Sequence, residues 1–254
     1  MTATGVDAIV ETKGLAKSFA GYRAVDDVSI SIAAGAIHAI IGPNGAGKTT
    51  FFNLLSGFVR PTSGSIALLG LDVTGMDAPR IARLGVVRSF QINSIFTHLS
   101  VLDNVKVSLE AKTDLPVRFW SSGAATKRLE PRARELLADV GLEKEKDLLA
   151  VQLSYGRKRA LELAISLAQE PAILLLDEPT AGMGSEDVGR ISQLIRRVSA
   201  GRTVVLVEHN LQVVADLSER ITVLQRGRVL VEGSYEQVRS DSRVIDAYLG
   251  GGHA

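Results

Sequence analysis

The first third of the chain contains short apolar runs that are typical of β-strands. The clearest run, residues 36–41, is continuously apolar and ends at Gly42, as a strand buried on both faces would. Lys48–Leu55 then suits a helix, and Gly57 stands where a helix commonly ends. The remaining runs predict strands at residues 8–13, 28–32, 65–69 and 85–89.

The middle of the chain has longer amphipathic segments, which indicate helices. Val101–Ala111 and residues 155–169 carry apolar positions at helical spacing. Pro131 is typical of the first position of a helix, so we expect that helix over residues 132–140. We expect residues 112–129 to form an irregular surface insertion, and the sequence gives this insertion no evident role.

The last third alternates between strand and helix patterns. This alternation is typical of a parallel sheet with helices packed on it. We therefore predict an α/β fold with a mixed or parallel sheet, an antiparallel N-terminal β-subdomain and an inserted helical subdomain. The single domain would span residues 7–250, with the helical insertion at roughly 97–170. The patterns predict strands at 172–177, 203–208, 221–225 and 228–231, and helices at 186–199, 211–218 and 242–249.

Composition narrows the function. The chain has 254 residues, no Cys and a net charge of +1. The absence of Cys excludes thiol nucleophiles, disulfides and Cys-ligated zinc. A charge near zero argues against a nucleic-acid binder held by bulk charge. No apolar run approaches the roughly 18 residues that span a bilayer, and residues 1–10 have no signal-peptide pattern.

The strongest chemical signal is the segment from Gly42 to Thr49, Gly-Pro-Asn-Gly-Ala-Gly-Lys-Thr. It fits the phosphate-loop pattern and lies between a predicted strand and a predicted helix, the context that the pattern requires. Glycines let successive backbone N–H groups face the phosphates, Lys48 supplies a positive charge, and Thr49 offers a hydroxyl to Mg²⁺. The predicted ATP-binding residues here are Gly42, Pro43, Asn44, Gly45, Ala46, Gly47, Lys48, Thr49 and Thr50.

A second signal is the apolar run at residues 173–176 that ends in Asp177 and Glu178. A phosphate-loop ATPase needs two carboxylates beside its loop. Asp177 would bind Mg²⁺, directly or through water, and Glu178 would act on the water that attacks the γ-phosphate. A strand whose acidic end merely meets solvent is the alternative, and the phosphate loop makes that alternative the weaker one.

A third signal is Leu-Ser-Tyr-Gly followed by a basic helix start. A second anion site of this kind is redundant within one chain. Here the sequence resembles the ATP-binding cassette (ABC) family, in which two cassettes dimerise head to tail. The resemblance implies that each ATP is bound by the phosphate loop of one subunit and the signature segment of the other. The signature residues, acting in the partner's site, would be Leu153, Ser154, Tyr155, Gly156 and Arg157.

The resemblance covers nearly the whole chain and implies further roles. Phe19 stands where the family places an aromatic ring that stacks on adenine. Gln91 matches a glutamine that senses Mg²⁺ and faces the membrane partner. His209 matches a histidine that contacts the γ-phosphate and supports catalysis by Glu178. Taken alone, Phe19 would more simply be a core residue and His209 a structural residue at a strand end.

Departures from the family pattern point to a subgroup. Tyr155 replaces the usual Gly of the signature segment, and Arg157 replaces the usual Gln. Gly184 stands where many cassettes have an Asp that makes a contact across the dimer, so this contact is in question here. The chain resembles the ATPase subunits of branched-chain amino acid importers in four places: the Leu-Ser-Tyr-Gly segment, residues 180–184, residues 208–210 and the ending at 244–250. Related importers for urea or short amides share much of this pattern.

Other readings fit less well. A lipid or lipopolysaccharide exporter ATPase is the nearest alternative. A soluble chromosome or ribosome cassette would need long heptads or a second motif set, and a P-loop kinase would need no signature. The resemblance implies ATP and Mg²⁺, a second ATPase subunit, permease subunits and indirectly a solute-binding protein, at the cytoplasmic face of the inner membrane. Ile95, Phe96 and Leu99 would then either receive a permease helix or pack within the subdomain.

Overall fold

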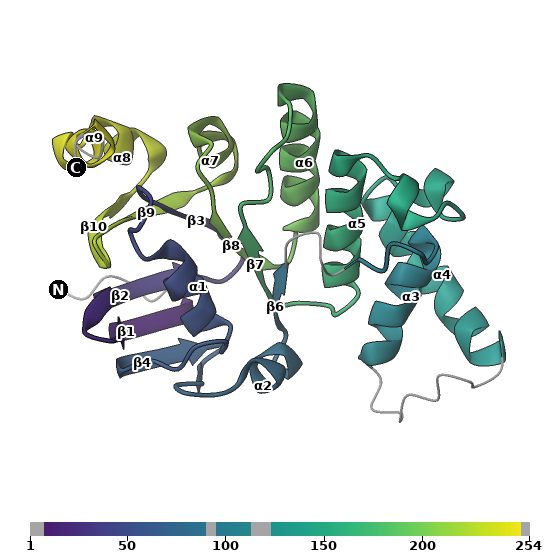
Figure 1. Cartoon of the computed structure of the whole chain (residues 1–254), viewed down its shortest axis with the longest axis horizontal. Coiled ribbons are helices and arrows are strands. Elements are labelled where there is room, and N and C mark those ends of the chain that lie inside the picture. Colours follow the sequence, from purple (N-terminus) through teal and green to yellow (C-terminus); the bar gives the residue numbers. More distant parts are fainter. Residues whose placement is uncertain (1–7, 90–94, 113–122, 250–254) are drawn as a thin grey trace. The chain divides into compact units, whose positions relative to one another are not determined.

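The computed structural model describes residues 8–89, 95–112 and 123–249, which form two compact units (Figure 1). The first unit contains the chain up to Val86, Ala172–Pro179, and the chain from Ser199 on. The second contains Val87–Pro171 and Thr180–Val198. The predicted helical subdomain at 97–170 falls within the second unit, which also includes residues 180–198.

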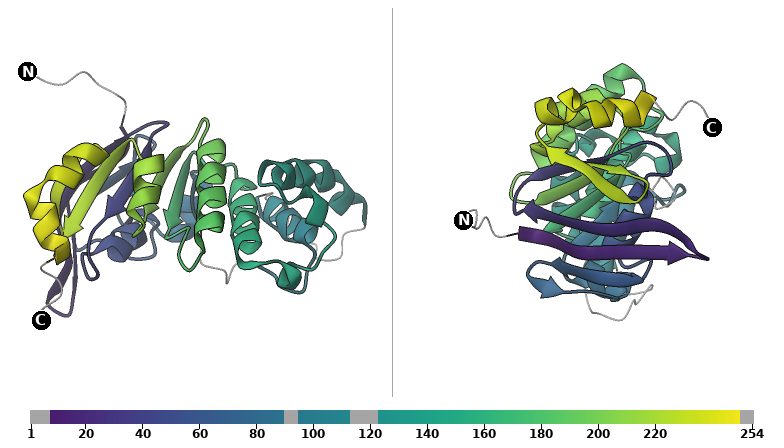
Figure 2. Two further views of the ribbon diagram at one scale, coloured as in Figure 1. Left: turned by 90° about the horizontal axis from the view of Figure 1, so that it is seen from above. Right: turned by 90° about the vertical axis from the view of Figure 1, so that its left-hand side faces the viewer.

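An antiparallel sheet opens the first unit, in the order β2-β1-β4-β5. Figure 2 shows β1 and β2 side by side and running in opposite directions. Both are longer than their alternation predicted, because register shifts near Thr12 and Leu15 interrupt the period of two. The four strands are β1 (Ala8–Phe19), β2 (Tyr22–Ala33), β4 (Ser63–Leu68) and β5 (Leu71–Asp72).

A second, mixed sheet has the order β10-β9-β3-β8-β7-β6. Strands β9, β3, β8 and β7 are parallel, and β10 is antiparallel to β9. Every residue of β3 and β8 is buried, which explains their unbroken apolar sequences. The strands are β3 (Ile37–Ile41), β6 (Val86–Ser89), β7 (Ile173–Asp177), β8 (Thr203–Val207), β9 (Arg220–Gln225) and β10 (Arg228–Gly233).

Helix α1 (Lys48–Leu55) is the centre of the core of the first unit. Its adjacent Phe51 and Phe52 are both fully buried, so the helix is buried over a wide arc, and it contacts both β2 and β7. Burying each ring contributes about 1.5–3 kcal/mol relative to exposure. The core joins side chains from both sheets, so it fixes the loop before α1 relative to the strand ends.

Four shorter helices complete the first unit, and two of them, α2 and α8, were not predicted. Each of these two has only six residues, too short for a clear periodic pattern, but each begins at a capping side chain, Asp77 or Ser234. The four helices are α2 (Ala78–Arg83), α7 (Leu211–Leu217), α8 (Tyr235–Ser240) and α9 (Ser242–Leu249).

The second unit is helical among its described residues, apart from the end of β6, and Figure 1 shows α3, α4 and α5 grouped together. Two linked predictions were wrong: α4 begins at Gly123 and passes through Pro131 instead of starting there, so residues 123–129, expected to belong to an irregular insertion, are helical. Residues 113–122 of that insertion lie outside the described residues. The residues before Pro131 are rich in Ala, Lys, Arg, Leu and Glu, and these strong helix formers outweigh the hydrogen bond that Pro removes. The helices are α3 (Val101–Ala111), α4 (Gly123–Asp139), α5 (Tyr155–Leu167) and α6 (Ser185–Val198), with short turns η2 (Glu143–Glu145) and η3 (Ala150–Gln152).

Candidate functional site

Three parallel strands bring the strongest sequence signals to one edge of the mixed sheet. Strand β8 lies between β3 and β7, with Val207 paired to Ile40 on one side and to Asp177 on the other. The carboxyl ends of the three strands therefore lie at the same level. Ligands of open α/β sheets bind at this edge, and here it carries the Gly-rich loop, Glu178 and His209.

The Gly-rich loop joins β3 to α1, as predicted, and its backbone conformation requires glycine. Gly47 has φ 100° and ends the loop as the N-cap of α1, with no side chain capping the helix. A Cβ atom on Gly47 would lie 2.3 Å from the carbonyl oxygen of Ala24, and one on Gly42 would lie 2.1 Å from that of Leu224. The first N–H groups of α1 are thus available to an anion.

Lys48 is buried, with 6% of its surface exposed, and its ammonium is held by the loop. Its Nζ donates hydrogen bonds to the carbonyl oxygens of Gly42, at 2.6 Å, and Pro43, at 3.0 Å. Burial lowers the pKa of Lys48, while the carboxylates of Glu178 and Asp177 act in the opposite direction. The lysine is therefore a fixed positive charge within electrostatic range of both carboxylates.

Glu178 and His209 form a pair at the ends of adjacent strands. The Oε1 atom of Glu178 lies 2.7 Å from Nε2 of His209, and the Glu178 backbone N–H donates to the carbonyl of Val207 at 2.9 Å. Glu178 has φ 48°, a left-handed conformation that non-glycine residues rarely adopt and that is enriched at functional sites. Both side chains remain partly exposed. The Glu178 carboxylate can therefore contact a water molecule while the His209 imidazole orients the carboxylate.

Glu208, to which the sequence patterns assigned no role of its own, supports His209. It is 3% exposed, and its Oε2 accepts hydrogen bonds from the backbone N–H groups of His209, at 2.9 Å, and Asn210, at 3.1 Å. Asn210 in turn caps α7 by accepting from the N–H groups of Gln212 and Val213. The turn that carries His209 is therefore fixed on both sides by side chain to backbone bonds.

Oxygen donors suited to a hard divalent cation lie at the same edge. Thr49 is exposed in the first turn of α1, and Asp177 ends β7. Within the described part of the chain, no group of three His, Cys, Asp or Glu side chains could hold a metal ion unaided. That donor set fits Mg²⁺, which usually takes one or two protein oxygens and completes its octahedron with phosphates and water. Gln91, the third predicted ligand, lies outside the described residues.

Phe19 is a surface residue. It ends β1 with 44% of its surface exposed, pairs across the hairpin with Tyr22, which is 63% exposed, and lies under the Lys17 ammonium at 5.0 Å from the ring centroid. The simple core assignment for Phe19 is therefore wrong. Paired positions point to the same face of the sheet, so Tyr22 adds a second exposed aromatic ring that the sequence patterns did not single out.

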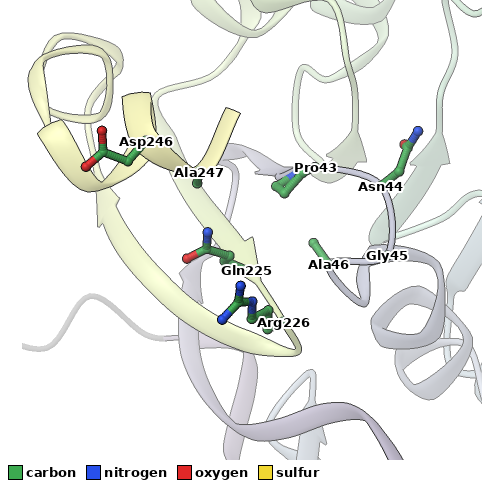
Figure 3. Close-up of a pocket in the computed structure, with 8 residues that line it drawn as sticks. All are labelled: Pro43, Asn44, Gly45, Ala46, Gln225, Arg226, Asp246 and Ala247. Carbon is green, nitrogen blue, oxygen red and sulfur yellow. The ribbon is translucent and has the colours of Figure 1, made fainter. Parts of the chain in front are cut away.

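A cavity of about 250 Å³ adjoins the Gly-rich loop on the side of the β9–β10 hairpin and α9 (Figure 3). Its lining includes none of Phe19, Thr49 and Asp177, so it differs from the predicted adenine and Mg²⁺ positions. Helix α9 also reaches the loop through Tyr248: burial raises the pKa of this phenol, and the Gly42 backbone N–H opposes that shift by hydrogen bonding. The lining residues are Pro43, Asn44, Gly45, Ala46, Gln225, Arg226, Asp246 and Ala247.

The Leu-Ser-Tyr-Gly segment begins α5 in the second unit. Ser154 is the N-cap by backbone geometry, yet its side chain makes no capping hydrogen bond, unlike Ser100 before α3. Ser154 and Tyr155 are exposed, whereas Leu153 is buried and anchors the segment. The Ser154 hydroxyl is therefore not used to cap α5, so the simple N-cap role for Ser154 does not hold.

Gly156 and Arg157 pack against the rest of the second unit. A Cβ on Gly156 would lie 2.9 Å from the carboxyl carbon of Asp187, in the first turn of α6. Arg157 donates to the carbonyl of Gly141 at 2.7 Å and pairs with Glu145 at 3.0 Å. Arg157, which replaces the usual Gln, is therefore engaged within its own unit.

An exposed apolar patch lies elsewhere on the second unit. Ile95 is 7% exposed and belongs to the interior, whereas Phe96 and Leu99 are 55% and 37% exposed. The segment 97–101 is hydrogen-bonded to the segment 148–151, which adds more exposed apolar side chains beside them. The residues of this apolar patch are Phe96, Leu99, Leu148, Leu149 and Val151.

Comparison with known proteins agrees with this arrangement. A family model described as "ABC transporter" matches residues 25–181, and one described as "Branched-chain amino acid ATP-binding cassette transporter" matches residues 228–254. The high-affinity branched-chain amino acid transport ATP-binding protein LivG of Escherichia coli K12 is 37% identical over 95% of this chain and 98% of its own length. The lipopolysaccharide export system ATP-binding protein LptB of Acidithiobacillus ferridurans is 35% identical over 95% of this chain and 97% of its own.

A solved structure shows the same fold with nucleotide products. The dimeric post-hydrolysis structure of the ATP-binding cassette MJ0796, bound to ADP and Pi, aligns with a TM-score of 0.75 and 28% identity over 89% of this chain and 98% of that chain. The predicted α/β cassette fold, with its antiparallel and mixed sheets, is confirmed by this likeness. Together with the Gly-rich loop, the paired carboxylates and the open start of α5, these matches show that the chain belongs to the ABC transporter family of ATP-binding cassettes.

Proposed function

We propose that this chain is the ATP-hydrolysing subunit of an importer for branched-chain amino acids or related small polar solutes such as urea and short amides. The observation that carries the solute class is the match of the branched-chain family model to residues 228–254, the segment that contains α9 and meets the phosphate loop through Tyr248. The similarity to LivG over nearly the whole chain supports it. LptB is nearly as similar, so export of lipopolysaccharide is the alternative.

The geometry supports hydrolysis in a single displacement. Water attacks the γ-phosphorus while the bond from that phosphorus to the bridging oxygen of ADP breaks, and the water proton passes to the Glu178 carboxylate. His209, 2.7 Å from Glu178, orients that carboxylate. Lys48 and the first N–H groups of α1 stabilise the phosphate oxygens. Thr49, Asp177 and Gln91 would hold Mg²⁺, which supplies charge neutralisation when bound.

We further infer that the catalytic unit is a dimer with composite sites. Each site would combine the phosphate loop of one chain with Ser154 and Gly156 of a second cassette, identical or related. Support comes from the uncapped start of α5 and from the dimeric cassette bound to ADP and Pi. The adenine would stack on Phe19.

Complementation between inactive variants tests the composite site. Chains carrying Lys48→Ala and Ser154→Ala are each expected to be inactive as homodimers. Mixed, they form heterodimers in which one site carries both lesions and the other carries neither, so activity should return. A monomer with full, concentration-independent ATPase activity would refute the composite site.

We propose that the apolar patch around Phe96 and Leu99 receives a short cytoplasmic helix from the permease and places the chain at the cytoplasmic face of the inner membrane. No helix among the described residues is long and apolar enough to cross a membrane itself. The patch has the apolar character that a helix-binding groove requires, and Phe96 at its edge is 55% exposed.

Phe96→Asp should weaken permease association and transport while ATP binding persists. Leu71→Asp is the matched control, because Leu71 is 51% exposed in the first unit. Normal assembly and transport by Phe96→Asp would place the docking surface elsewhere.

Uptake by the assembled transporter tests the solute class. The chain would be reconstituted in proteoliposomes with the permease subunits and solute-binding protein encoded beside it. ATP-dependent accumulation of labelled leucine or urea would support import. Transfer of lipopolysaccharide out of the bilayer, without solute uptake, would favour the alternative.

A further inference from the structure

Tyr155 connects the start of α5 to the segment that follows β7. Its phenol donates a hydrogen bond to the carbonyl oxygen of Ala181 at 3.0 Å. The ring also lies over Gly182, because a Cβ atom there would be 3.6 Å from the Tyr155 Oη. Both contacts lie within the second unit. Glycine, the residue that many cassettes have at this position, could make neither contact.

A buried ion pair holds the phenol in place. Arg159 donates from Nη2 to the Tyr155 Oη at 3.2 Å, and its guanidinium carbon lies 5.5 Å from the centroid of the ring. On its other side, Arg159 donates from Nη1 to Glu162 at 2.8 Å, and the two side chains are only 9% and 4% exposed. The phenol oxygen therefore accepts one hydrogen bond and donates another, which fixes its rotation.

This pair is better suited to positioning than to stabilisation. Arg159 Nε and Glu162 Oε1 are buried without a hydrogen-bond partner. Burial also raises the pKa of Glu162, with the Arg159 hydrogen bond acting against it. The desolvation of a buried ion pair with unsatisfied atoms offsets much of its electrostatic attraction. The pair therefore contributes chiefly by fixing the geometry of its neighbours.

The two ends of this connection belong to different ATP sites in the proposed dimer. Tyr155 directly follows Ser154, which would contact the nucleotide held by the partner chain. Ala181 is the third residue after Glu178, which would act on the nucleotide held by its own chain. A shift at the start of α5 is therefore passed through one hydrogen bond to the segment that begins beside Glu178.

We propose that Tyr155 is a positioning residue that couples the two ATP sites of the dimer, an inference that rests on the composite site proposed above. ATP bound against the signature segment of a chain moves or fixes Ala181 of that chain through the phenol. Each site thereby adjusts Glu178 in the other. Energetic coupling between sites in proteins is typically about 5–150-fold, and a single hydrogen bond accounts for the lower part of that range.

Tyr155→Phe tests this coupling because it removes the hydroxyl and keeps the ring over Gly182. We expect the Hill coefficient for ATP to fall toward 1 and kcat to fall severalfold. The affinity of the monomer for a fluorescent ATP analogue and the midpoint of thermal unfolding should stay unchanged. Tyr235→Phe, a tyrosine in the first unit, is the matched control and should match the wild type in every measurement.

The outcomes separate this inference from the composite site itself. If wild-type ATPase activity is non-cooperative and independent of protein concentration, the composite site fails and the coupling fails with it. If the wild type is cooperative and Tyr155→Phe is equally cooperative, only the role of Tyr155 is overturned. A lower thermal midpoint with an unchanged Hill coefficient would identify a purely structural hydrogen bond and would also overturn the inference.

Discussion

Helices α1 and α5 both begin without a capping side chain, and they differ in what surrounds the open end. At the start of α1 in the first unit, a buried Lys48 is held by loop carbonyls and lies within electrostatic range of Asp177 and Glu178. At the start of α5 in the second unit, the exposed Ser154 and Tyr155 lead the helix. Both ends can bind an anion, but the carboxylates of Asp177 and Glu178 lie only at the first.

This difference is the basis for our proposal that one end carries the chemistry and the other end recognises the nucleotide of a partner. Catalysis needs a charge at the phosphates and a base at the water, and the first unit supplies both from adjacent strands. The second unit supplies a helix N-terminus, a hydroxyl and a rigid connection through Tyr155. Variants at the two ends should therefore fail in different ways.

The largest effect is expected at Glu178. Glu178→Gln keeps the shape of the side chain and removes the base, so hydrolysis should fall about 10²–10⁴-fold while ATP binding persists. Without turnover, an ATP-bound dimer should accumulate and be visible by size-exclusion chromatography. Glu186→Gln, an exposed residue of α6, should leave the rate unchanged. Near-normal turnover in Glu178→Gln would assign the base to another residue.

Lys48→Ala should act on binding instead of turnover alone. It removes a charge that meets the phosphates in both the ground and the transition state, so the Kd for ATP should rise roughly 10–100-fold. Titration with a fluorescent ATP analogue measures this. Lys13→Ala is the control, because Lys13 is exposed and pairs only with Glu11 among the ion pairs found in the described residues. An unchanged Kd in Lys48→Ala would mean that the loop backbone alone binds the phosphates.

The two units should also differ in their response to acid. His38 in β3 is 1% exposed and lies 2.8 Å from the Thr222 hydroxyl, and burial lowers its pKa to about 4. Between pH 6.5 and 4 the unfolded chain takes up a proton that the folded chain does not. The free energy of unfolding of the first unit should therefore decrease as the pH is lowered from 6.5 to 4, by at most about 3 kcal/mol.

Hydrogen exchange at pH 7 and pH 4.5 can locate that loss. Amides of the mixed sheet should lose protection, and His38→Gln should remove most of the pH dependence. His98, exposed in the second unit, provides the control substitution His98→Gln, which should change nothing. If wild type and His38→Gln lose protection equally, other groups control the acid response.

A smaller effect is expected at Gly156. In Gly156→Ala the new methyl would meet Asp187, which must move, so the start of α5 should shift. We expect ATPase activity of the dimer to fall about tenfold, which corresponds to ~1.4 kcal/mol of transition-state stabilisation, with nucleotide affinity of the monomer unchanged. Gly189→Ala, within α6 of the same unit, is the control, because no atom lies within 4 Å of a Cβ placed there. Reduced nucleotide affinity in the Gly156→Ala monomer would contradict the separation of roles.

The sequence alone determined the chemistry of the first unit. The phosphate loop, the strand ending in Asp177 and Glu178, and α1, α3 and α9 were predicted with their observed bounds or close to them. These features depend on local rules: glycines at required positive φ, continuous apolar runs for strands buried on both faces, and helical periodicity. Each rule acts over a few residues, so each can be read without the rest of the chain.

Only the tertiary structure shows which side chains far apart in the sequence contact one another. The bond from Glu178 to His209 spans 31 residues, and the bond from Tyr155 to Ala181 spans 26. The exposure of apolar side chains was likewise decided by the tertiary structure: Ile95 is buried, whereas Phe96 and Phe19 are exposed. The start of α4 was predicted too late in the chain, because Pro131 is tolerated inside a helix when the residues around the proline are strong helix formers. Such outcomes depend on packing between segments far apart in the chain, which residue patterns do not encode.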